Sequence, residues 1–384
     1  MILVIERKLG AAAGHHNSQI RALSALAGTT QLFFVTAHNQ STGLSAKTFA
    51  AVLATKKEID ENSTSCLADD IAAIENIIRS AANPVSAILV PTARGHDIRL
   101  GLALAQKKHE NPRICLRVLS VEVLGRLPPD HLMALRMSVQ SGAVLLQTET
   151  QDMSAHIHAT YGISASADLL LPCSFGVNEM HVSVPIQTAE RDTFRIGYFG
   201  QPRPEKGIAI IPSILKNIRT ACRNQQTRMK IEFVYQAPQR RHKLPMLKYV
   251  MQLKLFELDL RTRFAGIALK QMPSFLESDE LARAMASVDL FLLPYQMPDY
   301  AFRGSGIVID AVTLGKPIVY GEGLGMTQYL NTGNAEGART AEEFAEKILK
   351  ICSSPEAYRK SGSLAQRRLQ AAYIRTENLL QTLS

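Results

Sequence analysis

Two positively charged residues close to a glycine form the clearest candidate for chemistry. An apolar run from Phe194 ends at Gly200, and Arg203 and Lys206 follow just before Gly207. Guanidinium and ammonium groups bind phosphate oxygens, and so do the free N–H groups of a helix's first turn. This spacing predicts a diphosphate site directly after a strand. A solvated turn with two surface cations is the alternative interpretation.

A second candidate is the segment RGSGIVIDAVTLG, which begins at Arg303. Ser305 and Gly306 would open a helix and offer N–H groups to a phosphate, and Arg303 would add a positive charge. Asp310 is the charged residue of an otherwise apolar helix, and a buried carboxylate needs a partner. The hydroxyls of a ribose are one suitable partner. A salt bridge to Lys316 or Arg303 is the other.

The loop after the first apolar run, RKLGAAAGHHNSQ, supplies a third candidate. Gly14 leaves the backbone open to a ligand, and His15 and His16 place polar groups at the start of a helix. The loop does not match the G-x-G-x-x-G dinucleotide fingerprint. A simple helix start with an exposed pair of histidines is the alternative.

A weaker set of polar residues follows two other apolar runs of the first half. Arg94 and His96 come after the run SAILV, and Arg117 lies at the end of ICLRV. Ligands of parallel sheets bind beyond the carboxyl ends of the strands, so these side chains are candidates for holding a second ligand. Each one taken alone is more typical of a surface residue than of a ligand-binding residue.

The elements that would position these candidate residues are short apolar runs that alternate with amphipathic stretches. Alternation of this kind is typical of βαβ units and a parallel sheet. The stretch from Ala68 to Ala81, for example, puts isoleucines on one face of a helix. The predicted fold class is therefore α/β, with two Rossmann-like domains. The expected strands begin at Ile2, Gln31, Ser86, Ile114, Ala143 and Asp168, and then at Phe194, Met229, Arg263, Asp289 and Pro317.

The chain length also favours two domains, because 384 residues exceed what one hydrophobic core usually supports. The strand rhythm lapses between Asn178 and Arg191. We therefore expect an N-terminal domain over residues 1–185 and a C-terminal domain over residues 190–363. A helix over about 364–384 would pack back on the first domain.

Composition limits the classes of partner. A formal net charge of +9 favours anionic partners, whereas the absence of Trp and the low aromatic content argue against nucleic acid. No apolar run reaches the ~18 residues that span a bilayer, so we expect a cytoplasmic protein. The basic segment from Arg240 to Arg263 is either a peripheral membrane helix or an ordinary helix with a solvated basic face.

The second half of the chain resembles the GT-B glycosyltransferases of the family-4 type. The likeness is carried by Gly200–Gly207, by LESDELARAMASVDLFLLPY and by RGSGIVIDAVTLGKPIV. It covers about Phe194 to Val319. In the first half it is limited to the opening strand, the Gly/His loop and the βαβ rhythm. The resemblance implies a GT-B architecture, in which two Rossmann-like domains face a central cleft.

The resemblance also implies roles for the candidate residues. Arg203 and Lys206 would hold the diphosphate of a nucleotide-sugar, and Asp310 would contact its ribose; these three form the expected catalytic set. Asp310 matches the second glutamate of the family's E-x7-E motif, but Phe302 stands where the first belongs, and an R-x-S-G element takes its place. The expected donor-binding residues are Gly14, Gly200, Gly207, Arg303, Ser305 and Gly306, and the expected acceptor-binding residues are His15, His16, Arg94, His96 and Arg117.

The implied activity is transfer of a hexosyl group from a UDP- or GDP-linked donor, with retention, to a glycan, lipid-linked or small-molecule acceptor. No metal and no other cofactor is expected, because Arg and Lys would neutralise the diphosphate. Two alternatives stay open. The missing glutamate motivates a non-catalytic scaffold subunit, and a nucleotide-sugar epimerase would act without an acceptor.

Overall fold

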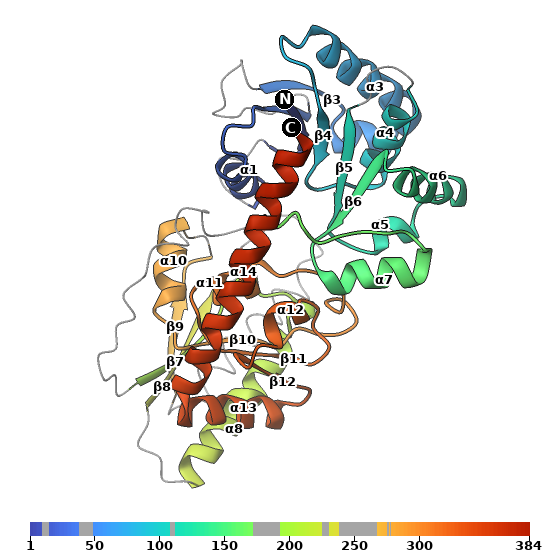
Figure 1. Ribbon diagram of the computed structural model, residues 1–384. Helices are drawn as coiled ribbons and strands as arrows, with labels where there is room; N and C mark the ends of the chain where they lie inside the picture. The colour runs from blue at the N-terminus through green and yellow to red at the C-terminus, as the bar shows by residue number, and fades with distance from the viewer. Residues whose placement is uncertain are drawn as a thin grey trace. The chain divides into compact units, whose positions relative to one another are not determined.

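The computed structural model describes residues 1–9, 15–37, 49–107, 112–171, 193–224, 230–237, 267–274, 276 and 278–384 (Figure 1). The chain divides into two compact units, which are described separately below. The first unit comprises Met1–Glu179, Phe302–Gly304 and Gln370–Ser384, and the second comprises Met180–Ala301 and Ser305–Leu369. The domain boundary predicted at residues 185–190 lies outside the described residues, and so does the basic segment from Arg240 to Arg263.

The described part of the first unit contains a parallel sheet of six strands in the order β3-β2-β1-β4-β5-β6. This is the strand order of the Rossmann fold. The order reverses between β1 and β4, and ligands of such sheets bind at the carboxyl ends of the strands beside that reversal. The strands are β1 (Ile2–Ile5), β2 (Leu32–Ala37), β3 (Phe49–Leu53), β4 (Ala87–Val90), β5 (Arg113–Val118) and β6 (Val144–Thr148).

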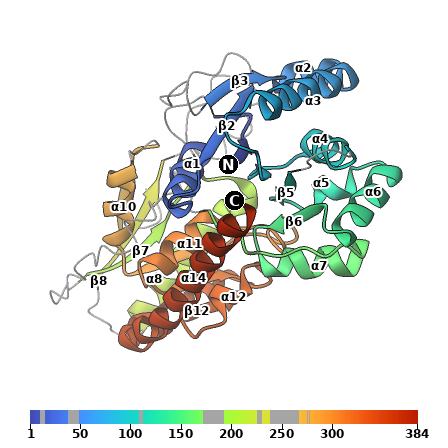
Figure 2. The same ribbon diagram turned by 45° about the horizontal axis from the view of Figure 1, so that its top comes forward.

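Helices cover both faces of this sheet. Figures 1 and 2 show α3, α4 and α6 on one side, and α1 with the end of α14 on the other. The expected face of α3 packs on the core, where Ile74 is fully buried. The helices are α1 (His15–Leu26), α2 (Lys56–Glu61), α3 (Ser63–Ser80), α4 (Gly95–Ala105), α5 (Glu122–Gly125), α6 (Pro129–Gln140), α7 (Gln151–Tyr161) and α14 (Pro355–Leu383).

The described part of the second unit repeats this topology with six parallel strands in the order β12-β11-β10-β7-β8-β9. The reversal here lies between β7 and β10. The strands are β7 (Thr193–Tyr198), β8 (Lys230–Gln236), β9 (Ala268–Met272), β10 (Leu290–Leu293), β11 (Ile318–Gly321) and β12 (Ala335–Ala338). The helices are η2 (Pro204–Lys206), η3 (Ile208–Ile210), α8 (Ile211–Asn224), α10 (Ser278–Ala286), α11 (Gly306–Thr313), α12 (Thr327–Leu330) and α13 (Ala341–Ser353).

The α/β class with two Rossmann-like units is confirmed, but one predicted strand is wrong. In the run DLLLP from Asp168, the three leucines at 169–171 are buried, yet they pair with no strand of the described residues. Its backbone groups bond instead to Thr376 of α14. The Leu170 amide donates to the Thr376 hydroxyl at 2.9 Å, and that hydroxyl lies 2.7 Å from the Asp168 carbonyl oxygen. A helix side chain thus satisfies the polar groups that a neighbouring strand would otherwise bond.

Helix α14 begins at Pro355, well before the predicted start near residue 364. Its residues up to Leu369 belong to the second unit and those from Gln370 to the first. The two chain ends lie close together in the first unit (Figures 1 and 2). Across the described residues, we find no helix with both the length and the apolar character that a membrane span requires.

Candidate functional site

The carboxyl end of β7 carries a lysine whose side chain turns back over the strand end. Gly200 has a φ of +85°, and a Cβ placed there would lie 2.6 Å from the Lys206 Nζ atom. The backbone conformation therefore favours glycine, and the lack of a side chain leaves room for the ammonium group. The same Nζ atom lies 5.5 Å from the centre of the Tyr295 ring, just beyond β10. Lys206 thus reaches the point where the strand order of the second unit reverses.

Arg203 lies on the same loop and faces a pair of tyrosines. Its Nη2 atom donates to the Tyr300 hydroxyl at 3.2 Å, and its Nε atom is 3.1 Å from Glu205 Oε1. The rings of Tyr300 and Tyr295 are 4.4 Å apart between centroids. The guanidinium remains partly open to solvent, with 41% of the side chain exposed. Arg203 and Lys206 are thus both held beside Tyr295, and Arg203 can still meet a ligand.

Tyr295 stays protonated at neutral pH. Burial of its ring is the main cause that raises its pKa, and the neighbouring Tyr300 and Asp310 raise it further. A hydrogen bond from Ser305 and the positive charge of Arg203 oppose this shift without cancelling it. A neutral tyrosine hydroxyl can donate a hydrogen bond to an anion.

The start of α11 meets this group. The Ser305 hydroxyl is 3.4 Å from the Tyr295 hydroxyl, and a Cβ on Gly200 would lie 3.7 Å from the side chain of Ile307, in the first turn of α11. Gly306 is the first residue of that helix. The structure therefore brings Gly200, Arg203, Lys206, Ser305 and Gly306 together at the carboxyl edge of the second sheet.

Other residues predicted for this site have different surroundings. Gly207 has a φ of +72°, and a Cβ there would lie 1.7 Å from the Pro294 carbonyl oxygen. Backbone conformation and packing therefore explain this glycine without a ligand. Asp310 is fully buried on α11. Arg303 is exposed, and its segment Phe302–Gly304 is grouped with the first unit. Gly14 lies outside the described residues.

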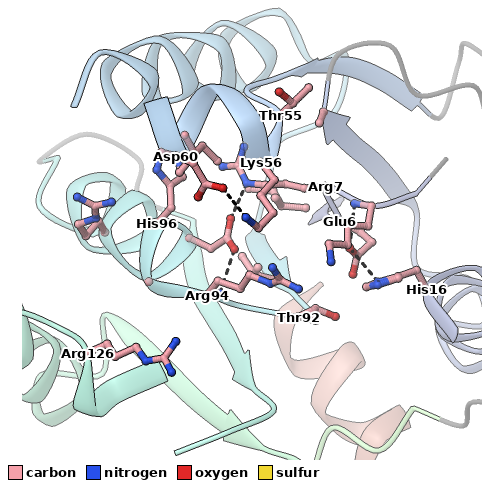
Figure 3. A pocket seen from close by; sticks show the side chains of 18 of the residues that line it. Glu6, Arg7, His16, Thr55, Lys56, Asp60, Thr92, Arg94, His96 and Arg126 are labelled. Atoms are coloured by element: carbon pink, nitrogen blue, oxygen red, sulfur yellow. Dashed lines mark hydrogen bonds and ion pairs between the residues drawn. The ribbon is translucent and has the colours of Figure 1, made fainter. Parts of the chain in front are cut away.

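The first unit contains a cavity of about 540 Å³. Figure 3 shows that its side chains come from the loop after β1, from the start of α2 and from the segment that leads from β4 into α4. This position matches the reversal of strand order between β1 and β4. Its charged and hydrogen-bonding residues include Glu6, Arg7, Lys8, His16, Thr55, Lys56, Asp60, Thr92, Arg94, His96, Asp97, Arg99 and Arg126.

Three cations of this cavity lie near one another. The pKa of Lys8 is lowered, first by partial burial and then by the positive charges of Arg94 and Lys56, which outweigh the attraction of Glu6. Figure 3 shows Lys56 and Arg94 reaching toward the middle of the cavity from different segments. Like charges held together in this way favour an anionic ligand.

A buried ion-pair network forms one wall of the cavity. Arg7 is 2.7 Å from Asp97 and 2.8 Å from Asp70, and the His96 Nε2 atom is 2.8 Å from Asp70. The Ala54 amide also donates to Asp70 at 2.8 Å. Burial by itself would raise the pKa of Asp70, but the bonds from His96, Arg7 and Ala54 together lower it. This network fastens the end of β1 to α3, to α4 and to the end of β3.

A second polar pair lies at the end of β1. His16 Nδ1 is 3.1 Å from Glu6 Oε1, and the Glu6 carboxylate is almost fully buried. Burial raises the pKa of Glu6, but His16, the Lys8 amide and the Thr92 hydroxyl lower it more. Glu6 is therefore an anion at neutral pH that orients the His16 ring at the cavity wall.

The predicted acceptor residues separate into two groups. His16, Arg94 and His96 line the cavity. Arg117 does not line it, because its side chain is fully buried and donates to the Pro91 carbonyl at 3.2 Å. The side chain of His15 is outside the described residues.

Sequence reasoning missed several residues of the cavity. Glu6 ends the first predicted strand, ILVIE, and Lys8 lies in the loop that follows, in which only glycine and histidine residues are predicted to bind a ligand. Lys56 follows β3, an edge strand whose sequence FAAVL shows no clear alternation. The signal for Glu6 and Lys8 is their position at the carboxyl end of β1, which flanks the β1/β4 reversal, and the signal for Lys56 is its position just after an edge strand of the same sheet.

No protein-family model and no curated protein matches the chain by sequence. Solved structures do share its fold. The trehalose 6-phosphate synthase of Burkholderia multivorans is 11% identical, with a TM-score of 0.69 over 100% of this chain and 97% of that one. A sucrose-phosphate synthase of Thermosynechococcus elongatus is 14% identical, with a TM-score of 0.64 over 99% and 97% of the two chains.

A third structure of this fold was solved with ligands. It is an Anabaena protein in complex with UDP and glucose, 14% identical to this chain, with a TM-score of 0.62 over 100% of this chain and 98% of that one. At such identities the likeness establishes the fold, which is the GT-B fold of glycosyltransferases.

Proposed function

We propose that this protein is a glycosyltransferase that moves a sugar from a nucleotide-diphosphate sugar to an acceptor. The observation that carries the proposal is the position of the Lys206 ammonium group over Gly200, beside Arg203 and the first turn of α11. Two cations and a helix start at the carboxyl edge of a Rossmann-like sheet form a site for a diphosphate. The Anabaena structure of the same fold, which holds UDP and glucose, supports the same class of donor.

In the proposed reaction the diphosphate is the leaving group. The bond between the anomeric carbon and the diphosphate oxygen breaks, and a bond from that carbon to an acceptor oxygen forms. Arg203, Lys206 and the N–H group of Gly306 would stabilise the negative charge that grows on the diphosphate. The neutral Tyr295 hydroxyl adds one more hydrogen-bond donor to that environment.

Retention and independence from metal ions are parts of this proposal. The leaving diphosphate oxygen would accept the proton of the acceptor hydroxyl on the same face of the sugar, so that no protein nucleophile is needed. Arg203 and Lys206 would supply the positive charge that a metal provides in other transferases. Asp310 would accept hydrogen bonds from the two ribose hydroxyls, because a carboxylate has enough lone pairs for both.

The acceptor is proposed to bind in the cavity of the first unit. Its volume of about 540 Å³ falls within the range of roughly 300–1,000 Å³ typical of small-molecule sites. His16, held by Glu6, would place a ring nitrogen at the acceptor hydroxyl. Arg94 would hold another part of the acceptor.

Nucleotide binding tests the donor site directly. Replacing a charged hydrogen-bond donor to a phosphate costs about 1.5–3 kcal/mol, so Lys206→Ala and Arg203→Ala should each weaken UDP or GDP binding by roughly 10- to 100-fold. Isothermal titration calorimetry measures the dissociation constants. Lys216→Ala is the matched control, because Lys216 is an exposed lysine of α8 in the same unit.

The comparison with the control decides the outcome. Lys216→Ala should bind the nucleotide as the unmodified protein does. If Lys206→Ala and Arg203→Ala also bind it unchanged, the diphosphate site is wrongly placed. Thermal unfolding of each variant shows whether a loss of binding reflects a loss of folded protein.

A further inference from the structure

The charges of the first-unit cavity do not balance. Each carboxylate of its wall has a cationic or histidine partner: Asp97 pairs with Arg7, Asp60 with Lys56, and Glu6 with His16. Among the described residues, no acidic side chain lies within ion-pair distance of Lys8 or of Arg94. Lys8 and Arg94 therefore each leave an unbalanced positive charge in the cavity, and so does Arg99, whose guanidinium contacts only the Ser63 hydroxyl within the described part of the chain.

Lys8 and Arg94 are held where a ligand can reach them. Lys8 follows β1 and Arg94 precedes α4, so they approach from the two strands that flank the reversal of strand order. Both side chains are exposed at the cavity. Partial burial lowers the pKa of Lys8 most, and the positive charge of Arg94 lowers it further, so an anion placed between Lys8 and Arg94 would relieve that repulsion.

A chain of hydrogen bonds and ion pairs fixes the position of the segment that carries Arg94. Asp97 accepts a hydrogen bond from the Arg94 amide at 3.0 Å and is itself held by Arg7. Arg7 also forms an ion pair with Asp70. Because these acids are already bonded to Arg7, they leave the Arg94 guanidinium available. The segment that carries Arg94 is thus rigidly connected to the sheet.

We propose that the acceptor bound in this cavity carries a phosphate monoester, held by Arg94 and Lys8 with Lys56 beside them. The inference rests on the proposed function and narrows its acceptor to a phosphorylated compound. A phosphate monoester has close to two negative charges near neutral pH, about the charge that Lys8 and Arg94 leave unbalanced. An arginine fork binds two phosphate oxygens at once, and a lysine binds a third as a point charge.

Apolar and hydroxyl groups complete the cavity in a way that suits a sugar. Ile5, Val90 and Leu127 offer apolar surface for the C–H groups of a sugar ring, and Thr55 and Thr92 offer hydroxyls. The Glu6–His16 pair contributes a hydrogen-bonding group to the same wall. A phosphate on the cationic side and a free hydroxyl at His16 would orient the acceptor.

Equilibrium binding to the full-length protein tests the proposal. The probes are inorganic phosphate, glucose 6-phosphate, glucose and glucuronate, together with vesicles that contain phosphatidic acid. Inorganic phosphate and glucose 6-phosphate should bind, and glucose should bind at least tenfold more weakly than its 6-phosphate. Arg94→Gln and Lys8→Gln should each weaken the binding of both phosphates by tenfold or more. Lys57→Gln is the control, because Lys57 is exposed beside Lys56 and outside the cavity.

The probes also identify the source of the phosphate. Binding of vesicles in place of soluble sugar phosphate, lost in Arg94→Gln, would support a lipid-borne phosphate at the same cations. Equal binding of glucose and glucose 6-phosphate would overturn the proposal. So would a preference for glucuronate, or equal effects of Arg94→Gln and Lys57→Gln.

Nucleotide affinity separates this inference from the proposed function. UDP and GDP binding, which depends on Lys206, should be the same in Arg94→Gln, in Lys8→Gln and in the unmodified protein. Nucleotide binding without phosphate binding would overturn the phosphorylated acceptor and leave the transferase proposal intact. Loss of nucleotide binding in the unmodified protein would instead contradict the proposed function.

Discussion

At the scale of single residues, Gly200 shows how one position serves both the backbone and the site. Its φ of +85° favours glycine, and the space where a Cβ would stand is taken by the Lys206 ammonium group. Any side chain at position 200 would displace Lys206 from the end of β7. The glycine therefore determines where the lysine's charge lies.

Replacing Gly200 should separate these two effects. Gly200→Ala should lose about 1–2 kcal/mol of stability from its positive φ, and it should also weaken nucleotide binding, because the new methyl group moves Lys206. Gly142→Ala is the matched control, since Gly142 has a φ of +76° and nothing within 4 Å of a Cβ. Denaturant unfolding and calorimetry measure the two quantities. Normal nucleotide affinity in Gly200→Ala would contradict the role given to Lys206.

The sequence predicted where the residues of this site lie in the fold. Arg203, Lys206 and Ser305 follow strands whose apolar runs are unmistakable, so their positions could be inferred from the pattern alone. The contacts with Tyr295 and Tyr300 could not be predicted, because they depend on how the loop after β10 packs against the loop after β7. No sequence spacing reports that packing.

At the scale of elements, α14 takes the place of the neighbouring strand that the run after Asp168 would otherwise bond. The apolar run LLLP after Asp168 has the composition of a buried strand, and only the position of Thr376 shows where its backbone bonds go. In contrast, β3 and β12 are strands that the sequence pattern did not predict. Both are edge strands, and the sequence AEGA of β12 contains a charge and a glycine that are unusual in a buried strand.

The contact between α14 and this run can be tested by one substitution. Thr376→Val keeps the shape of the side chain but removes the acceptor for the buried Leu170 amide. An unsatisfied buried donor costs about 1–3 kcal/mol, which should appear as a lower free energy of unfolding in urea. Thr382→Val, at an exposed position of the same helix, should change it little. Equal stability of the two variants would show that the Thr376 hydroxyl does not stabilise the fold.

The Asp70 network connects β1, β3, α3 and α4 and should be sensitive to acid. Asp70→Asn removes one partner of a buried ion pair, for which a loss of about 3–5 kcal/mol is expected in urea unfolding at pH 7. Asp69→Asn, exposed and adjacent on α3, is the control. Because the folded pKa of Asp70 is below its ordinary value of 3.8, its contribution is complete above that pH and is lost as the pH falls through the lowered pKa. A variant with unchanged stability at pH 7 would contradict the role of this network.

At the scale of the whole molecule, two sheets with the same strand order each carry cations at their reversal point. In the first unit these are Lys8 and Arg94, and in the second they are Arg203 and Lys206. The topology of each unit was predictable from the βαβ rhythm, and with it the edge where ligands bind. Which residues converge at that edge was only partly predictable, since Lys56 follows a strand that the pattern did not reveal.

The central claim is the transfer of a sugar from a nucleotide-sugar, and the release of nucleoside diphosphate tests it most directly. Radiolabelled UDP- and GDP-sugars are incubated with the full-length protein, with and without a panel of neutral and phosphorylated sugars, in the presence of EDTA. We predict that nucleoside diphosphate is released only when donor and acceptor are both present, and that Lys206→Ala reduces the rate at least tenfold. Absence of release with every donor, or conversion of the donor without any acceptor, would contradict the account.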